Sequence, residues 1–189
     1  MSLAARTYVA LLHHPVYNRE GRVVTTAVTN LDVHDIARSS RTYGLGGYFV
    51  VTPVQLQREL VSEIVAHWQG SRAQADQPRR QALELVEVAP SLEATIEQIS
   101  ANHGADPLVA ATAARQAADT TSWRRLRETC GADQRPMVLV FGTGWGLADQ
   151  VFDRAQIRLE PIWGPTDYNH LSVRSAVAIA LDRLFGREK

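Results

Sequence analysis

The sequence is a regular alternation of short apolar runs, rich in β-branched and aromatic residues, with segments whose apolar residues recur every three or four positions. Runs of the first kind predict β-strands, and their low charge indicates strands buried on both faces, as in a parallel sheet. We expect strands at residues 8–12, 48–52, 85–88, 108–112, 137–141 and 157–160. This order favours right-handed crossovers, so the predicted fold is an α/β domain, a mostly parallel sheet with helices on both faces.

Local signals place helices between the expected strands. One pattern of apolar residues begins after Pro53 and stops at Gly70, and Ser91 is a good N-cap for another. A further helix is expected to begin near Asn30 or Asp32, either of which can cap it. The remaining boundaries follow from the same periodicity, which gives helices at 54–69, 91–102, 119–129 and 169–185.

Length and cysteine usage limit the domain organisation and the compartment. A chain of 189 residues without internal repeats predicts a single domain over 1–189, with residues 71–78 as a polar loop too short to link domains. Cys130 is the single cysteine, which excludes an internal disulfide and suits a reducing cytoplasm. We expect no signal peptide and no membrane span, since no apolar run approaches the ~18 residues that a span needs. The expected location is cytoplasmic.

The charge balance argues against a strongly basic nucleic-acid binder. The formal net charge is +0, so any contact with RNA must rely on local clusters of positive charge. Every cation except Lys189 is an arginine, a side chain that can grip phosphate with a planar fork of donors. Such clusters are also common on solvated helix faces. Two stand out in the sequence: Arg72, Arg79 and Arg80, and then Arg124, Arg125 and Arg127.

Three strand-to-helix junctions carry unusual residues, at 29–38, 141–147 and 160–176. Such junctions matter because ligands of open α/β sheets bind beyond the carboxyl ends of the strands. The second junction has three glycines, which permit positive φ angles and close approach of a ligand to the backbone. The third is a Pro- and Gly-bounded loop that leads into a helix rich in small residues. Taken singly, the three are equally compatible with a capped surface helix, a tight turn and an ordinary core helix.

Several other chemistries lack their motifs. The glycine-rich junction is no dinucleotide fingerprint, because Leu147 stands where the third glycine is required. The adjacent His13 and His14 would point in opposite directions on a strand, and no spacing of histidines and carboxylates suits a metal ion. The chain also has no G-x-S-x-G elbow and no phosphate-loop lysine. We therefore expect no metal and no nicotinamide cofactor.

Taken together, the junctions resemble the ordered motifs of the SPOUT RNA methyltransferases. Arg38 followed by Gly44 resembles the first motif, residues 141–147 the glycine-rich second motif, and residues 169–181 the third motif. The stretches HHPVYN, TNLDVHDIARSSRTYG, FGTGWGLA and GPTDYNHLSVRSAVAIALDRLFG resemble a bacterial SPOUT family over nearly the whole chain. The resemblance implies a SPOUT fold with a C-terminal trefoil knot, a homodimer with active sites at the subunit interface, S-adenosyl-L-methionine as cofactor, and RNA (tRNA or rRNA) as substrate.

The resemblance also implies which residues form the site. Asp32, His34 and Asp35 are candidates for taking the proton of the acceptor. Arg38 is expected to orient the acceptor or contact phosphate rather than act as the base, because a guanidinium normally stays protonated. The residues expected to bind the cofactor are Thr112, Ala113, Gly142, Thr143, Gly144, Trp145, Gly146, Ile162, Gly164, Asn169, His170, Leu171 and Ser172.

The chain departs from the branch of this superfamily that methylates ribose. That branch typically has Asn where Asp32 stands, Glu where Thr143 and Gly144 stand, and Asn where Ser172 stands. The acceptor is therefore either a ribose 2′-hydroxyl or a base nitrogen. Two alternatives are a non-catalytic regulatory protein that binds the cofactor or RNA, and a methyltransferase for small molecules on the same fold. Labelling of RNA, of metabolites or of neither separates the three.

Overall fold

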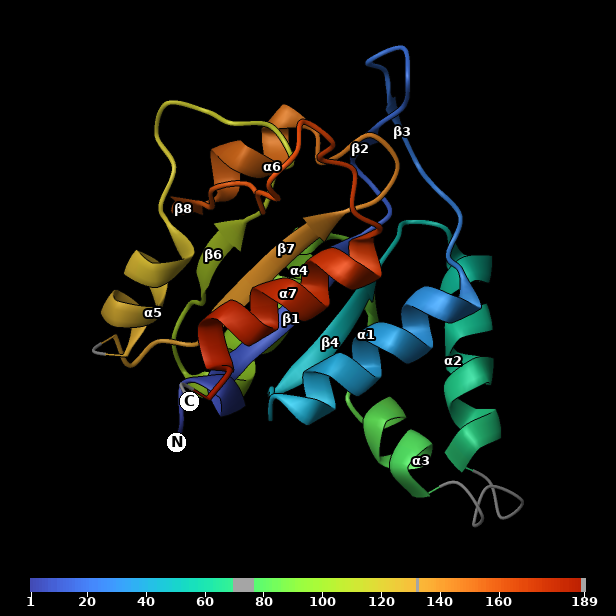
Figure 1. Cartoon of the computed structure of the whole chain (residues 1–189). Coiled ribbons are helices and arrows are strands. Elements are labelled where there is room, and N and C mark those ends of the chain that lie inside the picture. The colour runs from blue at the N-terminus through green and yellow to red at the C-terminus, as the bar shows by residue number, and fades with distance from the viewer. Residues whose placement is uncertain (70–76, 132, 188–189) are drawn as a thin grey trace.

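The computed structural model describes residues 1–69, 77–131 and 133–187 (Figure 1). The strands are β1 (Thr7–Leu12), β2 (Val16–Tyr17), β3 (Val23–Val24), β4 (Gly47–Val51), β5 (Val86–Ala89), β6 (Leu108–Ala111), β7 (Met137–Gly142) and β8 (Ile157–Arg158). The helices are the short η1 (Ala4–Arg6), α1 (Asn30–Thr42), α2 (Gln55–Gln69), α3 (Gln77–Leu83), α4 (Leu92–His103), α5 (Trp123–Cys130), α6 (Asp149–Arg154) and α7 (Val173–Phe185).

The main sheet has six strands in the order β5-β4-β1-β7-β6-β8, and every neighbouring pair is parallel. Leu12, at the end of β1, lies opposite Val51 on one side and Gly142 on the other. From β1 the chain first builds β4 and β5 on one side and then β6, β7 and β8 on the other. The strand order therefore reverses between β1 and β7, and the carboxyl ends of these strands form the topological switch point of the sheet.

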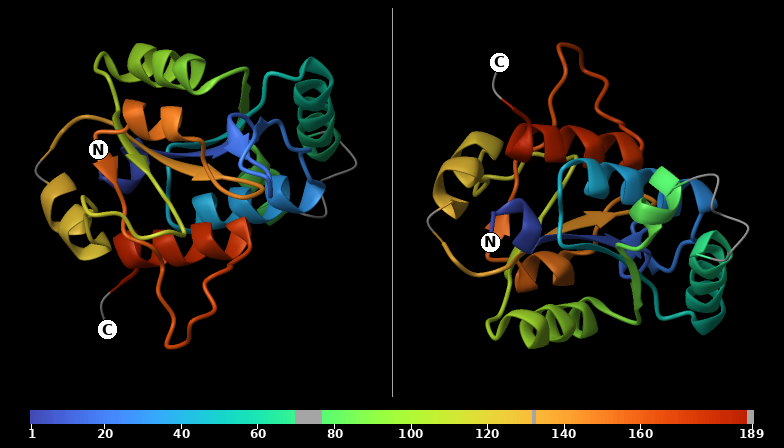
Figure 2. Two further views of the ribbon diagram at one scale, coloured as in Figure 1. Left: turned by 90° about the horizontal axis from the view of Figure 1, so that it is seen from above. Right: turned by 90° about the horizontal axis from the view of Figure 1, so that it is seen from below.

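Helices cover both faces of the sheet, as predicted, and two apolar clusters fill the space between the layers (Figure 2). Alternate β1 residues belong to opposite clusters, because successive side chains of a strand point to opposite faces. The first cluster packs β1 residues Val9 and Leu11 against α1, α2, α3, α5 and α7. The second packs Tyr8, Ala10 and Leu12 against α4 and α6. None of the described helices is long and apolar enough to cross a membrane.

The predicted strands all exist, with ends that shift by one or two residues. Ser91 caps α4 by accepting the N–H of Ala94, and Gly104 ends that helix in the left-handed conformation. The cap of α1 differs from both residues proposed for it: Thr29 accepts the N–H of Asp32, and its own hydroxyl donates to the Asp32 carboxylate at 2.7 Å. Thr29 is favoured over its neighbours because its hydroxyl makes two hydrogen bonds to Asp32, accepting from the backbone N–H and donating to the carboxylate.

Two predicted helices begin later than expected. The segment 119–129 becomes helical only at Trp123, and the segment 169–185 only at Val173. In each case a serine directly before the helix, Ser122 or Ser172, accepts the N–H of the residue three positions on. These caps fix the first turn more strongly than the apolar periodicity does.

The chain between β1 and α1 differs most from expectation. β1 ends at Leu12, so His13 and His14 do not lie on a strand as predicted but open a connection that leads into the β2–β3 hairpin. This hairpin was not predicted, because two-residue strands carry no visible alternation. Most of the predicted polar loop 71–78 lies outside the described residues, and so does Arg72; α3 begins within that loop at Gln77.

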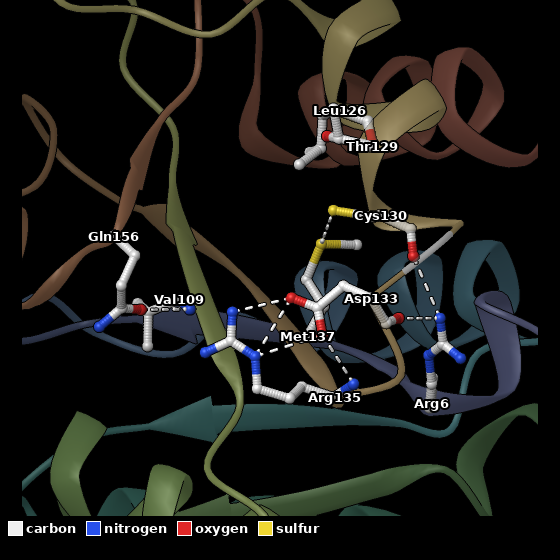
Figure 3. Close-up of polar contacts among 9 residues, drawn as sticks. All are labelled: Arg6, Val109, Leu126, Thr129, Cys130, Asp133, Arg135, Met137 and Gln156. Carbon is white, nitrogen blue, oxygen red and sulfur yellow. Dashed lines mark hydrogen bonds and ion pairs between the residues drawn. The ribbon is translucent and has the colours of Figure 1, made fainter.

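A buried arginine ties the N-terminus to the segment before β7 (Figure 3). Arg6 is 5% exposed, and its Nη2 donates to the Cys130 carbonyl oxygen at 3.1 Å and also to the Asp133 carbonyl oxygen. Carbonyl groups at the end of a helix lack partners within the helix, and here Arg6 satisfies the one at the end of α5. Arg135 pairs with the Asp133 carboxylate nearby, at 2.8 Å, but its side chain is 50% exposed.

We expect Arg6→Met to lower the free energy of unfolding by about 2–4 kcal/mol, because the substitution leaves buried carbonyl groups without donors. The control Arg135→Met removes an exposed ion pair and should cost about 1 kcal/mol or less. Urea denaturation followed by circular dichroism measures both. Equal losses in the two variants would show that Arg6 does not hold this loop.

Candidate functional site

The carboxyl ends of β1, β7 and β6 bring two of the predicted cofactor-binding segments to one edge of the sheet. Thr143, directly after β7, donates its backbone N–H to the Leu12 carbonyl at 3.3 Å. Thr112, directly after β6, donates its N–H and its hydroxyl to the Val140 carbonyl at 3.0 and 2.9 Å. The loop after β7 and the loop after β6 therefore begin side by side at the switch point.

The segment before α7 joins them through Asn169, whose side-chain amide donates to the Ala114 carbonyl at 2.7 Å. Within the described chain, the backbone groups of residues 161–171 make no hydrogen bond with other backbone groups. The same segment exposes large apolar side chains, with Trp163 53%, Tyr168 74% and Leu171 45% exposed. Backbone groups without backbone partners, beside exposed apolar side chains, are the features of a surface that a ligand or a partner covers.

Glycine is required in the loop after β7 by the backbone itself. Gly144 and Gly146 have φ angles of 59° and 104°, which L-residues rarely adopt. A Cβ on Gly144 would also lie 3.0 Å from the Tyr17 carbonyl oxygen, and one on Gly142 would lie 2.8 Å from the Leu147 nitrogen. The loop thus presents its backbone where side chains would otherwise stand.

The β2–β3 hairpin pairs with this loop in the manner of a short strand. Tyr17 donates its N–H to the Gly146 carbonyl, and Trp145 donates its N–H to the Tyr17 carbonyl, both at 2.9 Å. A bridge between Val16 and Leu147 extends the pairing. The indole of Trp145, itself 56% exposed, is left on the surface beside the hairpin. The shape of the glycine-rich loop therefore depends on the hairpin as well as on its glycines.

The predicted carboxylates lie at the start of α1, and α7 supplies their partner. Arg174 places its Nε 3.6 Å from one Asp32 oxygen and its Nη1 3.6 Å from an Asp35 oxygen. The Asp32 side chain is 12% exposed and the Asp35 side chain is 50% exposed. Arg174 was not predicted as a site residue, although it stands within the third motif. Only the packing of α7 on α1 reveals that it connects the two motifs.

The structure does not bring His34 or Arg38 to these carboxylates. The ring of His34 meets that of Trp68 on α2 edge-on, with centroids 5.7 Å apart. Arg38 is exposed, and its guanidinium forms no ion pair within the described residues. It lies almost opposite the buried stripe of α1 formed by Val33, Ile36 and Ala37, so it faces away from the sheet. Of the four predicted catalytic residues, two therefore meet and two stand apart.

His13 is a buried residue of the site that sequence reasoning did not select. Its Nδ1 lies 3.0 Å from the Thr26 hydroxyl, which in turn hydrogen-bonds the Thr143 hydroxyl of the glycine-rich loop. Burial lowers the pKa of His13, and the charge of Asp32 and the backbone of Ala27 only partly oppose this shift. The ring is thus held neutral as part of a chain of hydrogen bonds that runs from β1 to the predicted cofactor loop.

The hollows on the surface of the protein do not coincide with the residues predicted to form the site. One hollow lies along α2, and another lies between α5 and α7, where it is lined by Trp123, Arg127, Glu160 and Arg183. Neither is lined by a residue predicted to act in catalysis or to bind the cofactor, and no group of three metal-ligating side chains occurs among the described residues. The switch point and the loops that converge there define the candidate site instead.

Known proteins are similar in sequence to nearly the whole of this chain. A family model described as SAM-dependent RNA methyltransferase matches residues 6–186. A protein from Aquifex aeolicus, named only as uncharacterized, is 38% identical over 183 residues, which cover 96% of this chain and 89% of that protein. A protein from Oleidesulfovibrio alaskensis, named tRNA (guanine-N(1)-)-methyltransferase, is 44% identical over 183 residues, which cover 95% of this chain. The match covers 42% of that protein, so the chain spans less than half of its length.

Solved structures share the fold. TrmJ from Z. mobilis superposes with a TM-score of 0.62 at 15% identity, covering 97% of this chain and 70% of that one. The SpoU methyltransferase AviRb from Streptomyces viridochromogenes superposes with a TM-score of 0.60 at 13% identity, covering 96% and 59%. The predicted fold class, a mostly parallel α/β sheet of the SPOUT type, is confirmed by these likenesses and by the sheet order.

The buried, neutral His13 should make stability depend on pH. Below about pH 6.5 this histidine binds a proton more readily in the unfolded chain than in the folded chain. The free energy of unfolding therefore falls as the pH falls. In His13→Asn, whose amide can replace Nδ1 at Thr26, stability should fall less between neutral and mildly acidic pH than it does in wild type. Urea denaturation at about pH 7.5 and about pH 5.5 measures it. An unchanged pH dependence in the variant would contradict the assignment.

Proposed function

The chain belongs to the family of SAM-dependent RNA methyltransferases, and on this basis we propose that it transfers a methyl group from S-adenosyl-L-methionine to RNA. The observation that carries the proposal is that the loops after β6 and β7 begin side by side at the carboxyl ends of their strands, and that Asn169 ties the segment before α7 to the loop after β6. The substrate class that we propose is tRNA or rRNA. The name of the longer Oleidesulfovibrio relative favours tRNA, although the chain spans only 42% of that protein.

We propose that the cofactor lies against the loops after β6 and β7 and the segment before α7. The glycine-rich loop fits this role, because Gly144 and Gly146 hold positive φ angles and the space beside the Gly146 Cα is open. The segment 161–171 offers backbone groups that bond no other described backbone group, and Trp163 and Leu171 offer apolar surface. When bound, the cofactor would supply a methyl group on a sulfonium, whose sulfur is a good leaving group.

The residues of the chain have to orient the acceptor and take its proton. We assign the base to Asp35 rather than Asp32. The Asp35 side chain is 50% exposed, whereas the Asp32 carboxylate is 12% exposed and already accepts the Thr29 hydroxyl and faces Arg174. Arg174 lies between the two carboxylates and keeps them in place, and this tie joins the acceptor side on α1 to the cofactor side before α7. The assignment suits a ribose hydroxyl or a base nitrogen equally.

We also propose the C-terminal knot that the family resemblance implies. After β8 the chain runs against the connection between β6 and α5: Thr121 donates its N–H to the Arg158 carbonyl at 2.8 Å, and Glu160 donates its N–H to the Thr121 carbonyl at 3.0 Å. Asn169 then contacts Ala114 in the same connection before α7 packs on α1. This path past residues 112–122 supports threading of the last helix.

We further propose a cytoplasmic location, which the buried thiol of Cys130 and an RNA substrate support.

A homodimer is the assembly that we propose, with part of α7 and the segment before it at the interface. The exposed side chains of Trp163, Tyr168 and Leu171 form an apolar surface that a second subunit would cover. Light scattering at micromolar protein should give the mass of two chains, and Leu171→Glu should shift it toward one. A wild-type mass of one chain would contradict the proposal.

Arg38 tests the acceptor side, because it is exposed on α1 one turn after Asp35 and could contact RNA or a site in the partner subunit. Arg38→Ala should keep cofactor affinity but lose methyl transfer by roughly a hundredfold, the scale on which misplaced reactants reduce rates. The matched control is Arg41→Ala, on the same helix and also exposed. The assay is transfer of tritiated methyl groups to RNA from a strain that lacks the gene.

Each outcome of this assay decides between functions. Equal rates for Arg38→Ala and wild type would remove α1 from the acceptor side. Wild-type protein that retains the cofactor but labels no RNA would be a regulatory binder, and one that labels only small metabolites would be a different methyltransferase.

A further inference from the structure

The β2–β3 hairpin ends in a tightly hydrogen-bonded turn. Asn18 accepts the N–H of Glu20 at 3.0 Å and that of Arg22 at 2.9 Å on its side-chain oxygen. Its backbone accepts the N–H of Gly21 at 3.1 Å and donates to the Arg22 carbonyl at 3.0 Å. Gly21 supplies the positive φ, 74°, that the turn needs. The turn is therefore fixed by its own contacts, and little conformational entropy is lost when it meets a partner.

The side chains of this turn are charged and point into solvent. Arg19, Glu20 and Arg22 are all exposed, and Arg22 faces Glu20 at 3.6 Å with side chains 76% and 59% exposed. An ion pair of this kind contributes little to stability, so the fold does not explain the charges. Because the net charge of the whole chain is +0, a turn with two arginines and one carboxylate is a local excess of positive charge.

The position of the hairpin relates it to the candidate site. It projects at the end of the sheet where the loop after β7 and the segment before α7 lie (Figure 1). Its base pairs with the glycine-rich loop through Tyr17, Trp145 and Gly146. The N–H of Asp149, at the start of α6, also donates to the Tyr17 hydroxyl at 3.3 Å. A molecule whose reacting atom lies over the glycine-rich loop is therefore beside the hairpin and the exposed ring of Trp145.

We propose that the β2–β3 hairpin is an arm that holds the RNA substrate, with Arg19 and Arg22 contacting phosphates that flank the methylated nucleotide. The proposal rests on the proposed function and names the surface that this function uses. Arginine forks bind phosphate oxygens in two-pronged contacts, and a preformed turn holds them at a fixed distance from the methyl donor. The exposed indole of Trp145 lies where an unpaired base could stack, as is common in RNA recognition.

Phosphate contacts have a signature in the salt dependence of binding. Each contact that is lost lowers the slope of log affinity against log salt by roughly 0.7–0.9. Arg19→Ala combined with Arg22→Ala should therefore reduce the slope for total bacterial RNA, end-labelled and measured by filter binding, by about 1.4–1.8 units. Affinity at low salt should fall by at least about tenfold. Calorimetry should give an unchanged affinity for S-adenosyl-L-methionine.

Two further variants separate the arm from general charge. Arg80→Ala combined with Arg135→Ala removes the same number of charges, each from an exposed pair with a carboxylate, at the opposite end of the sheet. This control should change the slope little. Glu20→Gln, which removes the carboxylate beside Arg22, should instead strengthen RNA binding, an effect that damage to the fold would not produce.

The results distinguish the arm from the function beneath it. If wild-type protein neither binds nor methylates RNA, the proposed function fails and the arm fails with it. If wild type methylates RNA while the Arg19 and Arg22 double variant matches the control in affinity and slope, only the arm is overturned, and the charged turn then serves another partner.

Discussion

The hydrogen-bond ladders that hold β1 between β4 and β7 are the interaction on which the rest of the structure depends. Every residue of β1 is buried, and its side chains supply both apolar clusters in turn. Because the chain builds outward from β1 first to one side and then to the other, the loops that follow β1 and β7 emerge together. The first becomes the hairpin and the second the glycine-rich loop, so one choice of strand order creates the site.

Contacts between distant segments then give this edge its chemistry. The hairpin shapes the glycine-rich loop, His13 and Thr26 connect that loop to β1, and Arg174 joins α7 to the carboxylates of α1. The first two of these contacts hold the glycine-rich loop against the hairpin and the end of β1, and the third holds the start of α1 against α7.

The sequence predicts the elements well where a local rule determines them. Short apolar runs such as residues 137–141 are typical of buried strands. Ser91 and Gly104 mark the ends of α4, because a serine hydroxyl can accept a free N–H and glycine tolerates a positive φ. It predicts poorly what depends on long-range pairing. The two-residue strands of the hairpin are stabilised by the glycine-rich loop more than a hundred residues away, and Arg174 gains its meaning only when α7 packs on α1. Periodicity on one helix likewise could not reveal that His34 faces α2.

The central claim is that the backbone of the glycine-rich loop binds S-adenosyl-L-methionine, and calorimetry with Gly144→Ala tests it most directly. An alanine at position 144 must adopt a left-handed backbone conformation, which costs about 1–2 kcal/mol. Its methyl group would also lie 3.0 Å from the Tyr17 carbonyl oxygen. The control is Gly131→Ala, at an ordinary helical φ of −62°, where an added Cβ would meet only the Glu128 carbonyl oxygen at an ordinary contact distance of 3.9 Å. The account predicts that wild type and Gly131→Ala bind the cofactor alike, and that Gly144→Ala, still folded by circular dichroism, binds at least about tenfold more weakly, the effect of 1.4 kcal/mol. Equal affinity in all three proteins would contradict it.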